Sequence, residues 1–360
     1  MNNSIVEKLK NNGYEAYIVG GYVRDYLLGI DSRDIDICTN ASIDEIKEIF
    51  KDAGRSYDKY FSYHLDRDGY SYDITSYRKE LKYKNNKPTK LEYARTLKED
   101  LERRDFTINT LAIDSGGKLV DIFNSKSDLN SKTIKVVGDT EKRLTEDKTR
   151  IIRAIRLCCT LDFNLNMEIM SFLSKHGSYL KDIPREYIKK ELDKIFDEGG
   201  YNKFYSLVTY FKLEDYLNIK LKKIANVYDR YGVWAQIESD LPFTRVEKDK
   251  INKIKTILSK YYIDFSDLKE YDNDIIMNAA RILNMDKEVE AMKGLEDLHS
   301  IIDIDISINT MLNYVSVNNI RKIYKIIERN IIEGKLDNNS YSIEEFLRKR
   351  NYEWFKKCIY

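Results

Sequence analysis

The segment Ile18-Val19-Gly20-Gly21-Tyr22-Val23-Arg24-Asp25 joins a short apolar run to a helical pattern through a pair of glycines. We predict a strand over 15–19 and a helix over 22–28, because apolar residues recur at helical spacing in the second range. Glycines at such a turn let backbone N–H groups approach an anion, and the helix N-terminus adds partial positive charge. The segment is therefore a candidate phosphate site, with a plain glycine turn as the alternative.

Two carboxylates follow in a second alternating segment, Asp34-Ile35-Asp36-Ile37-Cys38. Side chains two residues apart on a strand point to the same face, so we expect Asp34 and Asp36 to converge while the isoleucines enter the core. Mg²⁺ takes oxygen ligands and completes its shell with water and substrate phosphates, so this pair is a candidate site for a metal-bound triphosphate. A solvated strand edge is the alternative. Asp73, in another alternating segment, would add a third carboxylate if its strand lies beside the first.

The first third of the chain has the pattern of mixed α and β structure. We predict a capped helix over 42–50 and two strands around a turn at 66–69. The polar range 79–96 has the composition of a mobile loop. From Thr140 onward the pattern is helical throughout, which predicts an α+β fold with an all-helical array behind the mixed N-terminal part.

A third motif, Arg103-Arg104-Asp105-Phe106-Thr107-Ile108-Asn109, sets two guanidiniums beside a carboxylate. Guanidiniums clamp phosphate bidentately, and a carboxylate accepts a hydrogen bond from a ribose hydroxyl. The motif is therefore a second candidate for nucleotide binding. A surface cluster of ion pairs is the alternative.

A fourth motif, Glu146-Asp147-x-x-Arg150, places an acceptor and a forked donor three residues apart on one face of a predicted helix. Arg153 and Arg156 continue the motif at the same step. An aspartate accepts from an exocyclic amine and an arginine donates to a ring nitrogen or carbonyl, so the pair matches the edge of a nucleobase. Ordinary salt bridges within the helix are the alternative.

Composition narrows the classes of function. In the 360 residues, 61 Lys and Arg balance 60 Asp and Glu, so any affinity for nucleic acid must come from local patches. No apolar run approaches the roughly 18 residues that a membrane helix needs, and no signal-type stretch opens the chain, so we expect a cytoplasmic protein with no membrane partner. The three histidines lie far apart in sequence and are interpreted as structural.

Taken together, the four motifs resemble, in order and spacing, the class II tRNA nucleotidyltransferase and bacterial poly(A) polymerase family. The resemblance implies a polymerase-beta-like nucleotidyltransferase head followed by a helical neck, body and tail. We expect the head over 1–137, the neck with the base-reading motif over 138–200, and an RNA-binding body and tail over 201–299 and 300–360.

The resemblance also implies roles for single residues. Asp34 and Asp36 would bind Mg²⁺, and Asp73 would assist them in catalysis. Asp147 and Arg150 would read the incoming base in place of a nucleic-acid template. The full set of implied nucleotide-binding residues is Gly20, Gly21, Arg24, Arg104, Asp105, Asn109, Asp147, Arg150, Arg153 and Arg156.

The activity implied by the resemblance is template-independent addition of CCA to the 3′ end of tRNA from CTP and ATP, with release of pyrophosphate. The partners would be the tRNA 3′ end and acceptor region. The long range 78–103 favours CCA addition or A addition, and Gly54-Arg55-Ser56-Tyr57-Asp58 replaces a basic segment typical of bacterial poly(A) polymerases. An A-adding enzyme, a poly(A) polymerase and a non-catalytic RNA-binding relative remain as alternatives.

Overall fold

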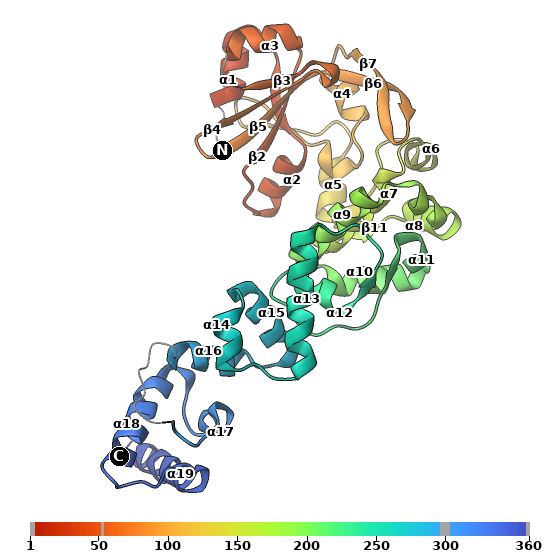
Figure 1. The fold of residues 1–360 in the computed structure, drawn as a ribbon. Helices are drawn as coiled ribbons and strands as arrows, with labels where there is room; N and C mark the ends of the chain where they lie inside the picture. The colour runs from red at the N-terminus through yellow and green to blue at the C-terminus, as the bar shows by residue number, and fades with distance from the viewer. Residues whose placement is uncertain (1–3, 52–53, 296–302, 358–360) are drawn as a thin grey trace. The chain divides into compact units, whose positions relative to one another are not determined.

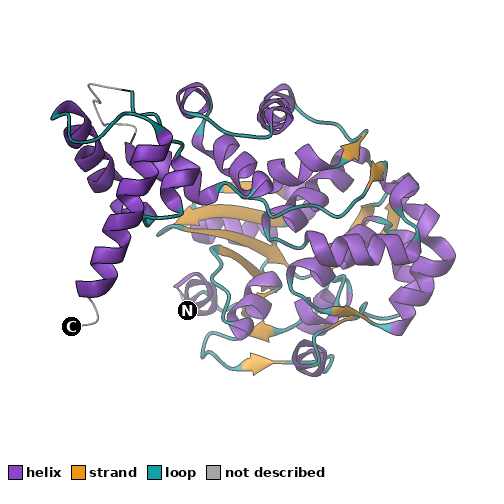
Figure 2. Cartoon of the chain, turned by 90° about the horizontal axis from the view of Figure 1, so that it is seen from below, coloured by secondary structure: helices purple, strands orange, loops and turns teal. Residues whose placement is uncertain are grey.

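The computed structural model describes residues 4–51, 54–295 and 303–357. The chain separates into two compact units, Met1–Ile219 and Lys220–Tyr360. The large sheet lies in the first unit, and the second unit is mainly helical (Figures 1 and 2). This arrangement confirms the α+β fold class.

The first unit is built on a seven-stranded sheet of order β3-β4-β5-β2-β1-β8-β9. β2 and β5 are parallel, and the other neighbours in the sheet pair in antiparallel fashion. The predicted strands over 15–19 and 34–38 and the two strands around the turn at 66–69 are confirmed. The strands are β1 (Ala16–Val19), β2 (Asp34–Thr39), β3 (Arg55–Tyr57), β4 (Ser62–Arg67), β5 (Tyr70–Ser76), β8 (Ala112–Ile113) and β9 (Leu119–Val120).

Short helices pack on this sheet because alternate strand residues such as Ile18, Ile35 and Ile37 are almost fully buried. α1 contacts β1 and α3, and α3 contacts β4 (Figure 1). The predicted capped helix over 42–50 is confirmed as α3, and its Ser42 forms a capping box with Glu45. The helices are α1 (Ser4–Asn11), α2 (Gly21–Leu28), α3 (Ile43–Phe50), α4 (Leu97–Glu102) and α5 (Ser125–Asn130).

The range predicted as a mobile loop is instead an antiparallel hairpin, β6 (Arg78–Lys84) with β7 (Lys87–Tyr93). Asn85 and Asn86 form its turn, with φ of 52° and 60°. Two residues at positive φ give the turn whose twist matches paired strands, and asparagine tolerates that conformation. The loop prediction was wrong because both strands are rich in charged residues and lack the apolar alternation that usually marks a strand.

Helices complete the first unit after residue 139. The expectation that only helices follow Thr140 was wrong at three short strands within the described ranges. The first is β11 (Asn164–Leu165), which pairs in parallel with β10 (Thr133–Ile134), and the other two lie near the start of the second unit. The helices are α6 (Thr140–Glu146), α7 (Thr149–Thr160), α8 (Met167–His176), α9 (Arg185–Asp197), α10 (Tyr201–Phe211) and α11 (Glu214–Leu217).

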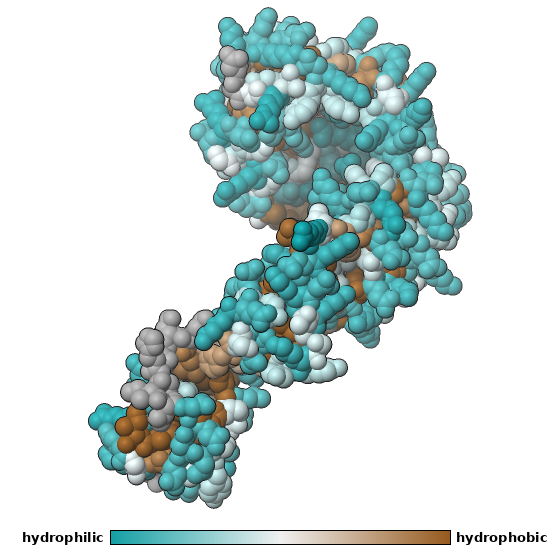
Figure 3. All heavy atoms as spheres, viewed as in Figure 1, coloured by the Kyte–Doolittle hydropathy of each residue, from teal (hydrophilic) through white to brown (hydrophobic). Residues whose placement is uncertain are grey.

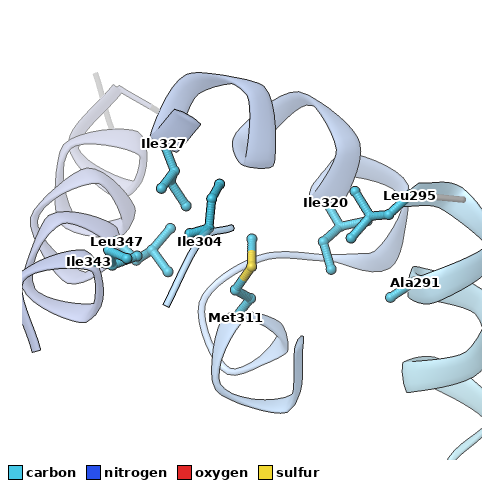
Figure 4. Packing of buried hydrophobic residues seen from close by; sticks show 8 residues of the cluster. All are labelled: Ala291, Leu295, Ile304, Met311, Ile320, Ile327, Ile343 and Leu347. Atoms are coloured by element: carbon cyan, nitrogen blue, oxygen red, sulfur yellow. The ribbon is translucent and has the colours of Figure 1, made fainter. Parts of the chain in front are cut away.

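The second unit is predominantly helical, with short strands β12 (Ile219–Lys220) and β13 (Glu238–Ser239) at its beginning. Near its end, eight residues form a buried apolar cluster, in which Met311 points from α17 toward α18 (Figure 4). The helices are α12 (Arg230–Gln236), α13 (Arg245–Lys260), α14 (Phe265–Glu270), α15 (Asn273–Leu283), α16 (Asp286–Leu295), α17 (Ile308–Leu312), α18 (Ile320–Ile332) and α19 (Ser340–Lys357).

The face of the molecule seen in Figure 3 is largely hydrophilic. Among the helices within the described ranges, none combines the length and the apolar character that a membrane crossing requires.

Candidate active site

The three predicted catalytic carboxylates lie on two neighbouring strands. Asp36 of β2 is in register with Asp73 of the parallel strand β5, and Asp34 precedes Asp36 by two residues. Asp34 and Asp73 are exposed, and Asp36 is half-buried. Burial raises the pKa of Asp36; Arg104 opposes this change, and Asp73 and Asp34 add to it. The expected neighbourhood of Asp73 and the Asp34–Asp36 pair is therefore confirmed.

The carboxylates fit a magnesium ion that arrives with a triphosphate. Within the ranges that the structure describes, no three or more His, Cys, Asp or Glu side chains are grouped so that they could hold a metal ion. Mg²⁺ commonly takes only one or two carboxylates from a protein and completes its shell with waters and substrate phosphates. Asp34 and Asp36 supply that donor set from one face of β2.

His64 is a neighbour of this site that the sequence interpretation missed. Its Nδ1 lies 2.8 Å from Oδ1 of Asp73, and its Nε2 lies 3.5 Å from Oδ1 of Asp66. The hydrogen bond to Asp73 raises the pKa of His64. The signal was present in the sequence, since a hairpin centred on the Asp68-Gly69 turn puts residue 64 opposite residue 73.

Gly20 allows three predicted site elements to meet. Its φ is +78°, and a Cβ at this position would clash with Oδ2 of Asp36 and lie 3.1 Å from Nη1 of Arg104. A Cβ on Gly21 would lie 3.4 Å from Nη2 of Arg24. The glycine turn, the acidic strand and the arginine motif are therefore in direct contact.

A chain of polar side chains, buried except for the partly exposed Arg153, runs from α2 to α7. Nη1 of Arg24 donates to Oδ1 of Asn109 at 2.8 Å, and Nδ2 of Asn109 donates to Oδ1 of Asp105 at 3.0 Å. Nη2 of Arg153 forms an ion pair with the other oxygen of Asp105. We call these four residues, Arg24, Asn109, Asp105 and Arg153, the polar relay.

The carboxylate at the centre of the polar relay is only 7% exposed. Burial tends to raise the pKa of Asp105, but Arg153, the Asn109 amide and the Phe106 N–H together hold it below its ordinary value. Asp105 is therefore ionised at neutral pH. Because the polar relay joins three segments of the sequence, it fixes the arginine motif relative to both helices.

Asp147 lies outside the helix on which the sequence analysis placed it. α7 begins at Thr149, and Oδ1 of Asp147 accepts hydrogen bonds from the Thr149 N–H at 3.0 Å and the Thr149 hydroxyl at 2.6 Å. The expectation that Asp147 and Arg150 share a helix face was wrong because Asp147 precedes α7 and its carboxylate accepts from the free Thr149 N–H at the helix start. The two side chains are nevertheless neighbours, with Nε of Arg150 3.8 Å from Oδ2 of Asp147.

Arg150 is 3% exposed and has several partners. Its Nη1 donates to the carbonyl of Arg143 at 2.7 Å and to Glu146 at 2.9 Å, and its Nη2 donates to the Tyr83 hydroxyl at 2.9 Å. Its guanidinium also lies 5.3 Å from the centre of the Tyr83 ring. Tyr83 belongs to β6 of the hairpin, and because this range was predicted to be a mobile loop, the contact between Tyr83 and Arg150 was not predicted.

The hairpin turn also contacts the segment between Asp147 and Arg150. Oδ1 of Asn86 accepts from the Lys148 N–H at 3.0 Å, and Nδ2 of Asn86 donates to the Asp182 carbonyl at 3.2 Å. The hairpin therefore lies against the motif that contains Asp147 and Arg150 (Figure 1).

Arg156 makes its ion pair away from the polar relay. Its Nε lies 2.6 Å from Oε2 of Glu191 in α9. The structure therefore links Arg156 to the helical part of the unit, whereas Arg153, one turn earlier, reaches the arginine motif.

Comparisons with known proteins are consistent with this geometry. Residues 16–135 match the family model of the poly A polymerase head domain. The CCA-adding enzyme of Ligilactobacillus salivarius is 32% identical over 95% of this chain and 72% of its own length. The CCA-adding enzyme of Streptococcus pyogenes serotype M3 is 28% identical over 96% of this chain and 95% of its own length.

Solved structures share the fold. The Bacillus stearothermophilus CCA-adding enzyme in complex with CTP gives a TM-score of 0.67 at 23% identity, with 98% of each chain covered. The Thermotoga maritima CCA-adding enzyme complexed with tRNA gives 0.59 at 21% identity, covering 96% of this chain and 93% of that one.

Proposed function

Since this chain belongs to the family of CCA-adding enzymes, we propose that it adds C, C and A to the 3′ end of tRNA from CTP and ATP. Pyrophosphate is released at each addition, and no nucleic-acid template is used. The acceptor region of the tRNA is the proposed RNA partner.

The polar relay is the observation that carries this proposal. It connects a proposed triphosphate contact, Arg24, with a proposed ribose contact, Asp105, and with α7, which contains Arg150 of the proposed base-reading pair. An enzyme without a template must recognise the base with its own side chains while it holds the phosphates. The polar relay supports both tasks because it holds the two sets of side chains in one framework.

The proposed chemistry is attack of the RNA 3′-hydroxyl on the α-phosphate of the nucleotide. Asp34 and Asp36 would hold Mg²⁺, which supplies Lewis-acid stabilisation of the attacking and leaving oxygens when bound. Arg24 and Arg104 would neutralise the phosphates. Arg24 is already oriented by Asp25, whose two carboxylate oxygens accept from it at 2.8 and 2.9 Å.

In the proposed base recognition, Asp147 accepts from the exocyclic amine that cytosine and adenine share, and Arg150 donates to the ring nitrogen or carbonyl. Uracil has no such amine, so Asp147 would disfavour UTP. Nη2 of Arg150 donates to the Tyr83 hydroxyl in this structure, and this hydrogen bond would restrain the guanidinium that reads the base.

We further propose the division expected from the sequence, with the catalytic head over 1–137, the neck over 138–200, and an RNA-binding body and tail over 201–299 and 300–360. A basic excess supports RNA binding by the body, since residues 201–260 include 12 Lys and Arg and 7 Asp and Glu.

The test uses pure protein with Mg²⁺ and three RNAs: a tRNA transcript that lacks CCA, one that ends in CC, and an unrelated hairpin. Labelled CTP and ATP are supplied separately and together. Growth of the first transcript by C, C and A is the expected result. Addition of A to the CC-ending transcript alone would indicate an A-adding enzyme, and long A tracts on every RNA would indicate a poly(A) polymerase.

The matched control for this assay is Asp34→Ala. Asp34 is exposed at the start of β2, so the variant should fold normally and lose nucleotide transfer. Normal transfer by the variant would contradict the proposed role of Asp34, and a wild-type protein that extends none of the RNAs would support a non-catalytic relative.

A further inference from the structure

Asp100, near the C-terminal end of α4, is a fully buried carboxylate that no predicted motif includes. Its Oδ1 accepts from the backbone N–H of Arg78 at 3.2 Å and from Nε of Arg103 at 2.9 Å. Its Oδ2 lies 3.6 Å from Nη2 of Arg104. One carboxylate therefore contacts three arginine residues, two of them through the guanidinium.

Burying a carboxylate is unfavourable unless charges and hydrogen bonds compensate for the lost water. The end of α4 supplies that compensation here, because Arg103 caps the helix, Arg104 follows it directly, and both guanidiniums reach back to Asp100. The guanidiniums of Arg78, Arg103 and Arg104 also lie close to one another. Burial lowers the pKa of Arg78 to about 10, and the neighbouring Arg103 contributes in the same direction. Without Asp100, these guanidiniums would repel one another.

The two arginines of the motif differ in how tightly Asp100 holds them. Arg103 makes a hydrogen bond to Asp100 and a longer contact of 3.5 Å to Glu80. Its guanidinium is therefore already paired with two carboxylates of the protein. Arg104 has only the looser contact at 3.6 Å, and its Nε has no hydrogen-bond partner among the described residues. Its Nη1 would lie 3.1 Å from a Cβ on Gly20, beside Asp36. Arg104 is therefore held from one side by Asp100, while its Nη1 lies toward the Gly20 turn, where a ligand would bind.

We propose that Asp100 is a positioning residue, which holds the Arg104 guanidinium through Nη2 so that its remaining donors face the triphosphate at the Gly20 turn. The inference rests on the proposed function, in which Arg104 contacts the triphosphate. Asp100 itself does not touch the nucleotide. Its loss should therefore weaken nucleotide binding more than it slows the chemical step.

The test is Asp100→Asn, which keeps the shape of the side chain and removes its charge. Steady-state CTP addition to a tRNA transcript is measured at saturating RNA. We expect KM for CTP to rise about tenfold, as for loss of one charged contact, with a much smaller change in kcat. An unchanged KM for CTP would overturn the inference.

A matched control separates positioning from general destabilisation. Asp267 is also fully buried and pairs with Lys260 at 2.6 Å, but it lies in the second unit. Asp267→Asn should lower the melting temperature as Asp100→Asn does, and it should leave KM for CTP unchanged. If both variants raise KM equally, Asp100 has only a structural role and the inference fails.

A double-mutant cycle identifies the side chain through which Asp100 acts. Arg104→Ala should raise KM for CTP, and the double variant with Asp100→Asn should be no worse than Arg104→Ala alone. If the changes in the logarithm of KM for CTP add fully in the double variant, the inference is overturned, but the proposed role of Arg104 still stands. An unchanged KM in Arg104→Ala would contradict the proposed role of Arg104 and the inference with it.

Asp100→Glu provides a second variant in case Asp100→Asn does not fold. It retains the charge and moves it by one methylene, so Arg104 should shift and KM for CTP should rise. A folded Asp100→Glu variant with normal KM would overturn the inference.

Discussion

The carboxylate of Asp36 is held half-buried beside Gly20 and Arg104, on the strand next to Asp73. Its ionised form is unfavourable there, since burial and two neighbouring carboxylates raise its pKa above that of an unfolded chain. A carboxyl group whose ionised form becomes favourable only when a cation arrives suits the proposed cation and triphosphate site beside the glycine turn. These contacts lead to two predictions at the scale of single residues.

Asp36→Asn should abolish nucleotide transfer without lowering thermal stability. A carboxyl group whose pKa is raised by folding favours the native state below its unfolded pKa, and this contribution is lost as pH rises through the folded pKa. Above its folded pKa, the ionised form of Asp36 therefore disfavours folding, and a neutral amide removes that cost. Melting temperatures at pH 4 and pH 7, with transfer assays, provide the check. A variant that melts well below wild type at pH 7 would contradict the interpretation.

Gly20→Ala should lose both transfer activity and stability, because the new Cβ clashes with Asp36 and the backbone at φ +78° disfavours alanine. Gly13→Ala is the matched control, since Gly13 has φ +88° and a Cβ added there would extend into open space. Backbone strain alone should lower the free energy of unfolding of both variants by about 1 kcal/mol. Urea unfolding and transfer assays should therefore show a larger loss in Gly20→Ala, and equal losses would exclude the clash.

Sequence patterns predicted these residues but not all of their contacts. The residue types and spacing of the glycine turn and the Asp34–Asp36 pair were sufficient to select both as candidates, and the structure places them in contact. The contact of His64 with Asp73 depends on strand register, and the burial of Asp100 depends on how α4 packs. The polar relay also could not be predicted, because it joins residues from three distant segments through side-chain geometry.

At the scale of elements, the β6–β7 hairpin is the largest difference between expectation and structure. Its strands pair along most of their length and its turn contacts the start of α7. Five of the seven residues of β6 and three of the seven of β7 are charged, and neither a period of two nor an apolar run indicates pairing. Two adjacent asparagines were the available signal, because they tolerate the left-handed conformation that a tight hairpin turn requires.

Tyr83→Phe should reduce discrimination between CTP and UTP. The change removes the hydroxyl that accepts from Nη2 of Arg150 and leaves the ring beside the guanidinium. Arg150 should then be less restrained, and we expect the selectivity ratio to fall about fivefold, as for loss of one hydrogen bond. Single-nucleotide incorporation with CTP and UTP measures the ratio.

The matched control for that variant is Tyr93→Phe, at the opposite end of the hairpin. The Tyr93 hydroxyl accepts a 3.5 Å hydrogen bond from the Ile43 N–H. This variant should keep the wild-type ratio. If the two variants change selectivity alike, the contact between Tyr83 and Arg150 is not the cause.

At the scale of the whole molecule, every candidate site residue lies in the first unit, Met1–Ile219. The change from mixed structure to helices was predictable from periodicity. The division between the units was not, because the sequence there has no glycine or proline cluster. Residues 221–229 contain no helix or strand, and Lys223 is exposed among them.

Limited trypsin digestion should therefore cut the chain after Lys223 before it cuts the first unit. We expect the N-terminal fragment to keep CTP binding, since it contains the polar relay and the acidic pair, and to lose efficient tRNA extension. Mass spectrometry of the fragments and CTP titration of the purified fragment measure both. Early cleavage within residues 78–93 would contradict the ordered hairpin.

The polar relay also has a consequence for synthesis of the protein. A ribosome releases Arg24 first, then Asp105 and Asn109, and Arg153 last. The nascent chain can form β1, β2 and β5 while Asp105 still lacks its cationic partner. A translation product that stops before residue 153 would thus contain the strands of the large sheet but leave Asp105 without its ion-pair partner, so we expect it to be less stable than the complete first unit.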